Sequence, residues 1–177
     1  LAVYGIEYIG PTLVWIVTTI VVSLALVVTI YPIGIMLTTR MNPIPFMKKT
    51  FKVGLFAAAT NSSAATLPLN TRTCVDELGC TEEISSFVLP TGMTVNMNGT
   101  TAMHMIAVTF IASAAGIDIK PSTLVVAAFL SICTAMGTPA IPVAGTTMVY
   151  VVMTGLGLNS DLCMIGYSLV LAMNYLP

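Results

Sequence analysis

At the centre of the chain lies the stretch Thr91-Gly92-Met93-Thr94-Val95-Asn96-Met97-Asn98-Gly99-Thr100-Thr101, a polar, glycine-containing interruption of a long apolar run. The surrounding residues 84–117 include no Asp, Glu, Lys or Arg, and a helix of about 20 apolar residues is enough to cross a bilayer. Inside a membrane an unpaired backbone N–H or C=O is costly, so a break in a helix persists where it lines a cavity or coordinates a ligand. The sequence therefore predicts a broken membrane helix over residues 84–117, with a binding site at the break.

The composition indicates an integral membrane protein. Hydrophobic residues make up 56% of the 177 residues and charged residues only 7%, whereas soluble domains carry about 25% charged residues. The net charge is −1 and the charges form short clusters, which leaves no basic face for nucleic acid. We expect a multi-pass protein of the cell membrane, more narrowly of a bacterial inner membrane, that contacts lipid and has no nucleic-acid partner. Because the chain begins at Leu1 and stops at Pro177 within an apolar run, we expect it to be a fragment.

The first part of the chain predicts a membrane helix followed by a helical hairpin. Residues 8–39 are uncharged and rich in Val, Ile, Leu and Thr, as expected of a transmembrane helix. By the positive-inside rule the basic loop that follows is cytoplasmic, with Arg40, Lys48, Lys49 and Lys52. Within residues 43–82 the apolar part is short, has turn-forming residues at its centre and is charged on both flanks. We expect a re-entrant hairpin and its cytoplasmic loop over residues 43–82, with the tip at Asn61-Ser62-Ser63.

The second part repeats this pattern from the opposite side of the membrane. Asp118 and Lys120 follow the broken helix and mark the outer side. Residues 121–158 are uncharged and have a Gly- and Pro-rich centre, so we expect a second re-entrant hairpin there. A last helix begins near residue 162 and is truncated at residue 177. Together these elements predict an all-α membrane protein with discontinuous helices that meet near the bilayer midplane, as in secondary transporters.

Three motifs make this prediction specific, and they lie at the tip of each hairpin and at the helix break. They read Thr60-Asn61-Ser62-Ser63-Ala64-Ala65-Thr66-Leu67-Pro68, Asn96-Met97-Asn98-Gly99-Thr100 and Gly137-Thr138-Pro139-Ala140-Ile141-Pro142-Val143-Ala144-Gly145. In order and spacing they resemble the dicarboxylate/amino acid:cation symporter family, the glutamate transporter homologues. The resemblance covers nearly the whole chain and implies that residues 1–177 are part of one transport domain, with two re-entrant hairpins around a broken helix.

The resemblance also implies a binding site between the two hairpin tips. Substrate would be bound by Asn61, Ser62, Ser63, Thr100, Ile141 and Gly145. Sodium ions would be bound through oxygen atoms of Gly92, Thr94, Asn96, Asn98, Ala135, Met136 and Thr138. Such a site is chemically consistent, because sodium prefers oxygen ligands and helix N-termini favour anions. The family implies sodium as the coupling ion, with protons as the alternative, and no other cofactor.

The implied function is secondary active symport, in which sodium or proton entry drives uptake of a dicarboxylate or an acidic amino acid by an elevator-type mechanism. The family also implies a homotrimer, formed through a scaffold domain that this chain lacks. Neutral amino acids or cystine are the alternative substrates. A channel or passive pore and a transport-inactive structural protein are alternatives of another class. An enzyme is not expected, because the serines have no histidine partner and the membrane segments have no paired carboxylates.

Two positions differ from the family motif, and one histidine is a candidate proton carrier. Asn98 stands where the family motif has an aspartate that binds sodium, and Asn61 stands where some relatives have an arginine beside the serine tip. The residues that hold the substrate amine and side chain in the family would lie beyond Pro177. His104 lies one helical turn after Thr100, at a position where related animal transporters have a proton-carrying glutamate. The resemblance therefore makes His104 a candidate proton carrier, with a hydrogen-bonded packing histidine as the alternative.

The four cysteines show no metal-binding pattern, because they form no CxxC pair and the chain has a single histidine. We expect four free thiols, although Cys74 and Cys80 flank a polar loop and could in principle form a disulfide.

Overall fold

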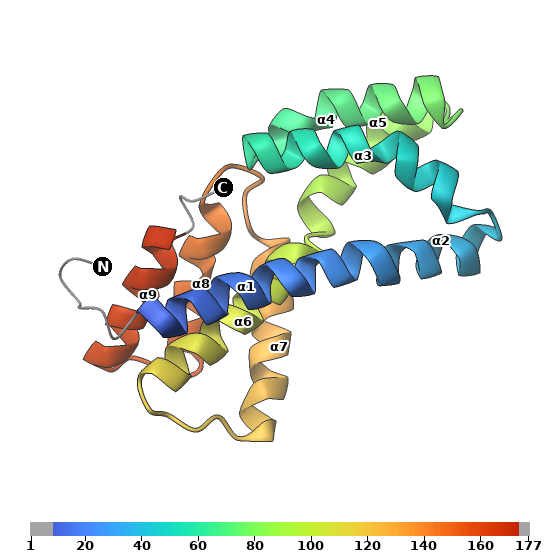
Figure 1. The fold of residues 1–177 in the computed structure, drawn as a ribbon. Coiled ribbons are helices and arrows are strands. Elements are labelled where there is room, and N and C mark those ends of the chain that lie inside the picture. Colours follow the sequence, from blue (N-terminus) through green and yellow to red (C-terminus); the bar gives the residue numbers. More distant parts are fainter. Residues whose placement is uncertain (1–8, 174–177) are drawn as a thin grey trace.

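The computed structural model describes residues 9–173, and every regular element among them is helical (Figure 1). Tyr8 and residues 174–177, which belong to the predicted first and last helices, lie outside the described residues. The predicted all-α fold is confirmed, and the order of the helices follows the predicted one. Whether the hairpins re-enter a membrane from one side stays a prediction.

The predicted first helix is one long rod with a local irregularity in its middle. It consists of α1 (Ile9–Ala25), the π-helical turn η2 (Leu26–Ile30) and α2 (Tyr31–Thr39). The irregularity precedes Pro32, which has no N–H to donate and whose ring crowds the carbonyl of Val28. Among the described residues, Gly10–Thr39 is the one helical stretch both long and apolar enough to span a membrane.

The first hairpin consists of α3 (Pro43–Thr60) and α4 (Ser63–Arg72), which pack side by side and are followed by the π-helical turn η3 (Thr73–Glu77) (Figure 1). Asn42 caps the start of α3 by accepting a hydrogen bond from the Ile44 N–H at 3.0 Å. The tip is tight because only Asn61 and Ser62 separate the two helices. Asn61 adopts a positive φ of 47°, a conformation that asparagine tolerates better than most residues.

The broken helix consists of α5 (Glu82–Val95) and α6 (Asn98–Ala114), so the break is confined to Asn96 and Met97. The interruption predicted over residues 91–101 is therefore shorter than its composition suggests. Thr91 and Thr94 lie within α5, where their hydroxyls find acceptors on carbonyls of their own helix, at 2.8 and 3.0 Å.

The second hairpin consists of α7 (Pro121–Met136) and α8 (Ala144–Gly155), and it is followed by α9 (Asp161–Met173). Its tip, residues 137–143, is longer than that of the first hairpin. Val143 has a positive φ of 68° at the end of this tip.

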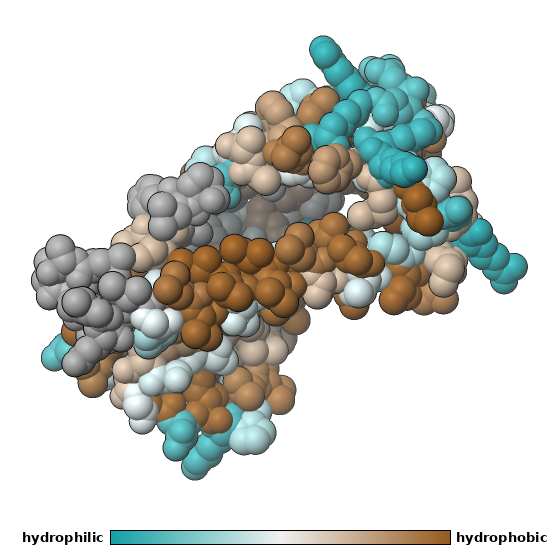
Figure 2. Space-filling model, in the orientation of Figure 1, coloured by the Kyte–Doolittle hydropathy of each residue, from teal (hydrophilic) through white to brown (hydrophobic). Residues whose placement is uncertain are grey.

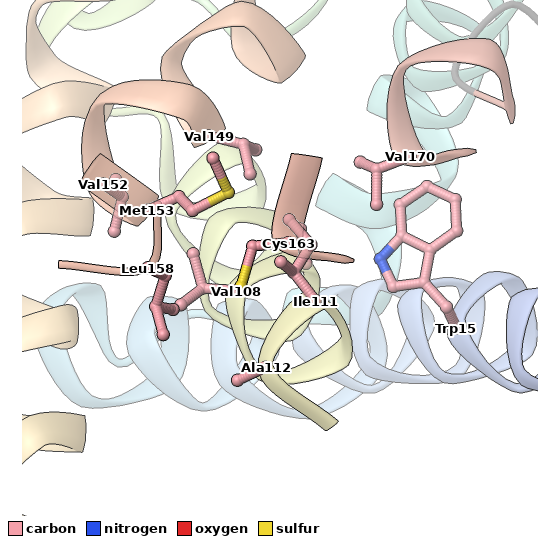
Figure 3. Packing of buried hydrophobic residues seen from close by; sticks show 11 residues of the cluster. Trp15, Val108, Ile111, Ala112, Val149, Val152, Met153, Leu158, Cys163 and Val170 are labelled. Carbon is pink, nitrogen blue, oxygen red and sulfur yellow. The ribbon is translucent and has the colours of Figure 1, made fainter. Parts of the chain in front are cut away.

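The core lies around α6, which packs against α1, α7, α8 and α9 (Figure 1). Val108 and Ile111 of α6 are fully buried against Met153 of α8 and Cys163 of α9, and Trp15 of α1 reaches toward Val170 (Figure 3). The first hairpin and α5 lie toward the α2 end of the rod, away from α9 (Figure 1). α6 is thus the fixed element against which the hairpin tips are placed.

The surface matches a membrane protein with polar ends. A hydrophobic band follows the α1–α2 rod, while hydrophilic residues gather over the base of the first hairpin and over the α6–α7 connection (Figure 2). The exposed apolar side chains of the rod include Leu24, Val28 and Leu37. The two charged regions that the sequence assigned to opposite sides therefore lie at opposite ends of the molecule.

Candidate functional site

Three chain breaks meet at one place in the structure: the tip of the first hairpin, the α5–α6 break and the tip of the second hairpin. The two tips are joined directly, because the carbonyl of Ala140 accepts hydrogen bonds from the Ala64 N–H and from the Ser62 hydroxyl, each at 3.2 Å. The Ser62 Oγ also accepts from the Ala65 N–H at 3.2 Å, which caps the start of α4. A single serine thus fixes the first tip and ties it to the second.

The tips and α6 line a half-open cavity of about 200 Å³, here called the tip cavity. All six residues that the resemblance assigned to substrate contribute to its lining: Asn61, Ser62, Ser63, Thr100, Ile141 and Gly145. They come from three segments that are far apart in the sequence. Met97 and Met103 line the same cavity, and no charged side chain of the described residues does. The predicted substrate residues are therefore brought together.

Helix ends give the tip cavity its electrostatic character. The helices α4, α6 and α8 all begin at this place, and their first turns contribute Ser63, Thr100 and Gly145 to the lining. Each helix N-terminus carries about half a positive charge and unpaired N–H groups. Three such ends favour an anionic group in the cavity without any basic side chain.

Two further cavities lie beside the break, and the candidate sodium ligands divide between them. A cavity of about 560 Å³ is lined by Gly92, Asn96 and Asn98 together with residues of the first hairpin. A cavity of about 380 Å³ is lined by Val95, Asn98, Ala135 and Met136. Thr138 lines the tip cavity instead, and Thr94 lines none of the three.

The 380 Å³ cavity has the better chemistry for a cation, because the C-terminal ends of both α5 and α7 reach it. The Asn96 N–H donates to the Gly92 carbonyl, which leaves the carbonyls of Met93, Thr94 and Val95 at the open end of α5. Helix C-termini carry partial negative charge, and carbonyl and amide oxygens suit a sodium ion. Among residues 9–173, no three His, Cys, Asp or Glu residues cluster as a metal site, so neutral oxygens would supply the ligands.

His104 is fully buried and joins α6 to both helices of the second hairpin. Its Nε2 lies 2.8 Å from the Gly145 carbonyl of α8, and its Nδ1 lies 3.1 Å from the Thr134 hydroxyl of α7. A carbonyl only accepts, so Nε2 carries a proton. The Thr134 hydroxyl either donates to Nδ1 or accepts from it, while it can turn its own proton to the Leu130 carbonyl at 2.8 Å. The surroundings thus accommodate both the neutral and the charged imidazole.

Gly145 packs closely against α6 and leaves little room there for a side chain. A Cβ atom on Gly145 would lie 3.2 Å from the Met103 Cε and 3.3 Å from the Thr100 Cγ2. These distances are shorter than ordinary van der Waals contacts. The first turn of α8 therefore packs against Thr100, the α6 residue that the resemblance assigns to substrate binding.

Comparison with known proteins places the sequence in a family. The model of the sodium:dicarboxylate symporter family matches residues 1–176. The chain belongs to this family. It is similar to excitatory amino acid transporter 2 of Mus musculus, with 30% identity over 99% of this chain and 30% of that protein. It is also similar to excitatory amino acid transporter 1 of Rattus norvegicus, with 32% identity over 86% of this chain and 28% of that protein.

An excitatory amino acid transporter of Caenorhabditis elegans is 33% identical over 72% of this chain and 25% of its own length. The chain spans about 30% or less of the length of these curated relatives. The resemblance to glutamate transporter homologues is confirmed, and the symporter family consists of transport proteins, so the prediction that the chain is not an enzyme is confirmed as well.

Some residues of the site were not predicted from the sequence. The carbonyl of Ala140 carries the contact between the tips, and Thr134 pairs with His104 across 30 positions. A backbone acceptor has no sequence signal, and one threonine among many does not stand out. Met97 and Met103 could have been suspected, because helical spacing places them on the same side of the chain as Thr100.

Proposed function

We propose that this chain is the greater part of the transport domain of a sodium-coupled symporter that takes up a dicarboxylate or an acidic amino acid. The observation that carries the proposal is the tip cavity, which is lined by residues from both hairpin tips and α6 and lies where hydrogen bonds join the two tips. The convergence of three helix N-termini supports an anionic substrate. The family match supports sodium coupling.

The site residues have distinct roles in this proposal. Ser63 and Thr100 contact the substrate with their hydroxyl groups, and Ser62 holds the two tips together over it. Ile141 and Gly145 belong to the second hairpin, which acts as the lid. One sodium ion binds at the end of α7 near Ala135, Met136 and Thr138, and another binds near Gly92, Thr94, Asn96 and Asn98.

The whole protein works in a membrane in this proposal. The apolar α1–α2 rod and the hydrophilic ends of the molecule support a multi-pass location in the cell membrane, for which a bacterial inner membrane is our narrower proposal. The transport domain would move as a unit between the two sides, in the elevator manner. Scaffold segments outside this chain would hold three copies together as a homotrimer.

Neutral amino acids or cystine form a second candidate substrate class. The observation that favours them is the absence of a charged side chain from the described lining of the tip cavity, where Asn61 replaces a possible arginine. A channel is the competing function of another class. It predicts conduction that does not saturate with substrate and does not require an ion gradient.

The decisive experiment is uptake by the full-length protein in liposomes, with labelled aspartate, a C4-dicarboxylate and a neutral amino acid under a sodium gradient or a proton gradient. Saturable, sodium-driven uptake of an acidic substrate supports the proposal. Sodium-driven uptake of the neutral amino acid alone would favour neutral amino acids or cystine as the substrate class. Passage of solute without any gradient overturns symport.

Asn98 offers a direct test of sodium coupling. The amide is neutral, so Asn98→Asp adds a carboxylate at the shared wall of the two cation cavities. We expect sodium to bind at least several-fold more tightly in Asn98→Asp, because a carboxylate attracts a cation in a low-dielectric site far more strongly than an amide does. The measurement is the sodium concentration that gives half-maximal uptake. An unchanged value would remove Asn98 from the ion site, and Asn159→Asp, outside the three cavities, is the matched control.

His104 is the proposed proton carrier, and His104→Gln tests it. Glutamine keeps an N–H that can donate to the Gly145 carbonyl but cannot take up a proton at neutral pH. We expect uptake by the variant to lose its dependence on external pH between about pH 5 and 8, the range in which histidine ordinarily titrates. A pH profile identical to that of the unchanged protein would leave His104 as a packing residue.

A further inference from the structure

Cys74 and Cys80 lie at the base of the first hairpin, in the turn that leads from η3 to α5. The Cys80 N–H donates to the Cys74 carbonyl at 3.0 Å, and Gly79 between them adopts a positive φ of 75° that closes the turn. With standard bond lengths, such a hydrogen bond holds the two Cα atoms within about 7 Å of each other. A disulfide needs a Cα separation of roughly 4.4–6.8 Å, so the hydrogen bond keeps the two backbones close to the spacing that a disulfide spans.

The two thiols differ in their surroundings. Cys80 is exposed and Cys74 is half-buried, with its Sγ 3.8 Å from the Asn70 Oδ1. Burial, and then repulsion from a Cys80 thiolate, raise the pKa of the Cys74 thiol. Cys80 is therefore the thiol that meets an oxidant first, and Cys74 is placed to respond.

The turn itself is anchored on one side. Lys49 of α3 donates to the Glu77 carbonyl, and Lys52 forms an ion pair with the Glu77 carboxylate. Glu77 lies between the two cysteines in the sequence, so η3 is held against α3 while Cys80 follows on the free side of Gly79. Closing a bond between the cysteines would thus need movement of the short segment 78–80 alone.

We propose that Cys74 and Cys80 form a reversible dithiol–disulfide site that a small-molecule disulfide, such as oxidised glutathione, converts to an intramolecular disulfide. The Cys80 thiolate attacks one sulfur of the oxidant, which releases one small thiolate that takes up a proton. The Cys74 thiolate then attacks the Cys80 sulfur of the mixed disulfide and releases the second small thiol. Two protein thiols and one small disulfide become one protein disulfide and two small thiols, so atoms and electrons balance. All four cysteines of the described chain are free thiols, which corresponds to the reduced state.

Oxidation has a structural consequence for the neighbouring cavity. In a disulfide with Cys80, Cys74 has no S–H left to donate to the Asn70 Oδ1. The Asn70 side chain therefore loses this hydrogen bond. Asn70 lines the 560 Å³ cavity together with Asn96 and Asn98. This part of the inference rests on the proposed function, because it links the disulfide to ion and substrate binding. We expect the oxidised protein to show a change of about 2-fold or more in half-maximal sodium concentration, as the loss of one weak hydrogen bond would give.

The test uses the full-length protein in liposomes, equilibrated with oxidised or reduced glutathione and then alkylated. Cleavage with a glutamate-specific protease cuts after Glu77, so fragments that carry Cys74 and Cys80 stay linked only through a disulfide. We expect linked fragments in the oxidised sample of the unchanged protein and of Cys133→Ser, and none in Cys80→Ser. Linked fragments that appear only between different copies of the chain, or no linkage at any ratio of the two glutathiones, overturn the site.

Uptake measured on the same samples separates the two parts of the inference. A sodium dependence that changes on oxidation in the unchanged protein, but not in Asn70→Ala, supports the link to the cavity. A disulfide that forms without any change in sodium dependence overturns the link and leaves the site in place. Absence of uptake in both the oxidised and the reduced protein would count against the proposed function. The disulfide itself is tested separately, because fragment linkage is measured without transport.

Discussion

The two hairpin tips differ in length and in how their backbone is stabilised. The first tip is two residues long, and its own residues stabilise its conformation. Asn61 tolerates a positive φ, and the Ser62 hydroxyl caps α4. The second tip spans residues 137–143 and ends at Val143, a β-branched residue in the same unusual backbone region. No side chain caps the start of α8. The first tip is thus built to hold its shape, and the second depends on contacts with other elements.

Three contacts between the second tip and other elements can be named. The second tip is held by the hydrogen bonds from the first tip to Ala140, by the contact of Gly145 with α6 and by His104. Beyond these contacts, α8 also packs into the core through Val149, Val152 and Met153, and α7 packs against α6. This difference supports a fixed first tip and a detachable second tip, as a lid over the tip cavity requires.

The largest expected effect comes from crowding the lid where it meets α6. Gly145→Ala would place a methyl group within 3.3 Å of Met103 and Thr100. Overpacking of this kind costs about 1–3 kcal/mol, so we expect the Michaelis constant for substrate to rise roughly 5- to 150-fold. The measurement is uptake against substrate concentration in the full-length protein. Gly137→Ala is the matched control, because its Cβ would meet only backbone oxygens at 3.7 and 3.8 Å; equal effects of the two variants would contradict a special contact at Gly145.

A second, smaller effect is expected in the first tip. Ser62→Ala removes the cap of α4 and one of the two hydrogen bonds to Ala140, and loss of such a cap costs about 0.5–2 kcal/mol. Because the first tip is the fixed one, we expect this loss in the thermal stability of the purified protein even without substrate. Gly145→Ala should act mainly on substrate binding.

Ser62→Thr, which keeps a capping hydroxyl, should recover most of the stability. Ser86→Ala on α5, far from the tips in the sequence and with its hydroxyl on a local carbonyl, should leave it within about 0.5 kcal/mol of the original value. An unfolding temperature that is identical for Ser62→Ala and the unchanged protein would show that the cap is not what fixes the first tip.

The helices could be predicted from the sequence, because charge-free apolar runs and Gly- or Pro-rich breaks follow directly from the cost of exposing backbone in a membrane. The length of the break at the centre of the chain could not. Thr91 and Thr94 read as break residues, but their hydroxyls bond to their own helix. The six proposed substrate residues, which all line the tip cavity, were assigned through motifs. The contacts between the tips and around His104 could not be predicted, since the Ala140 carbonyl and the Thr134–His104 pair come into contact only when distant segments pack.

The smallest expected effect compares the two positive-φ residues directly. Val143→Gly relieves a backbone conformation that costs about 1–3 kcal/mol, and the added freedom of glycine takes back about 0.5–1 kcal/mol. Asn61→Gly gains little relief, because asparagine already tolerates this conformation, and it carries the same entropic penalty. Thermal unfolding without substrate should therefore move in opposite directions, up for Val143→Gly and slightly down for Asn61→Gly. If both variants lowered the unfolding temperature by the same amount, the backbone strain in the second tip would be no greater than in the first. The proposed detachment of the second tip would then depend only on its missing helix cap and on its contact with α6.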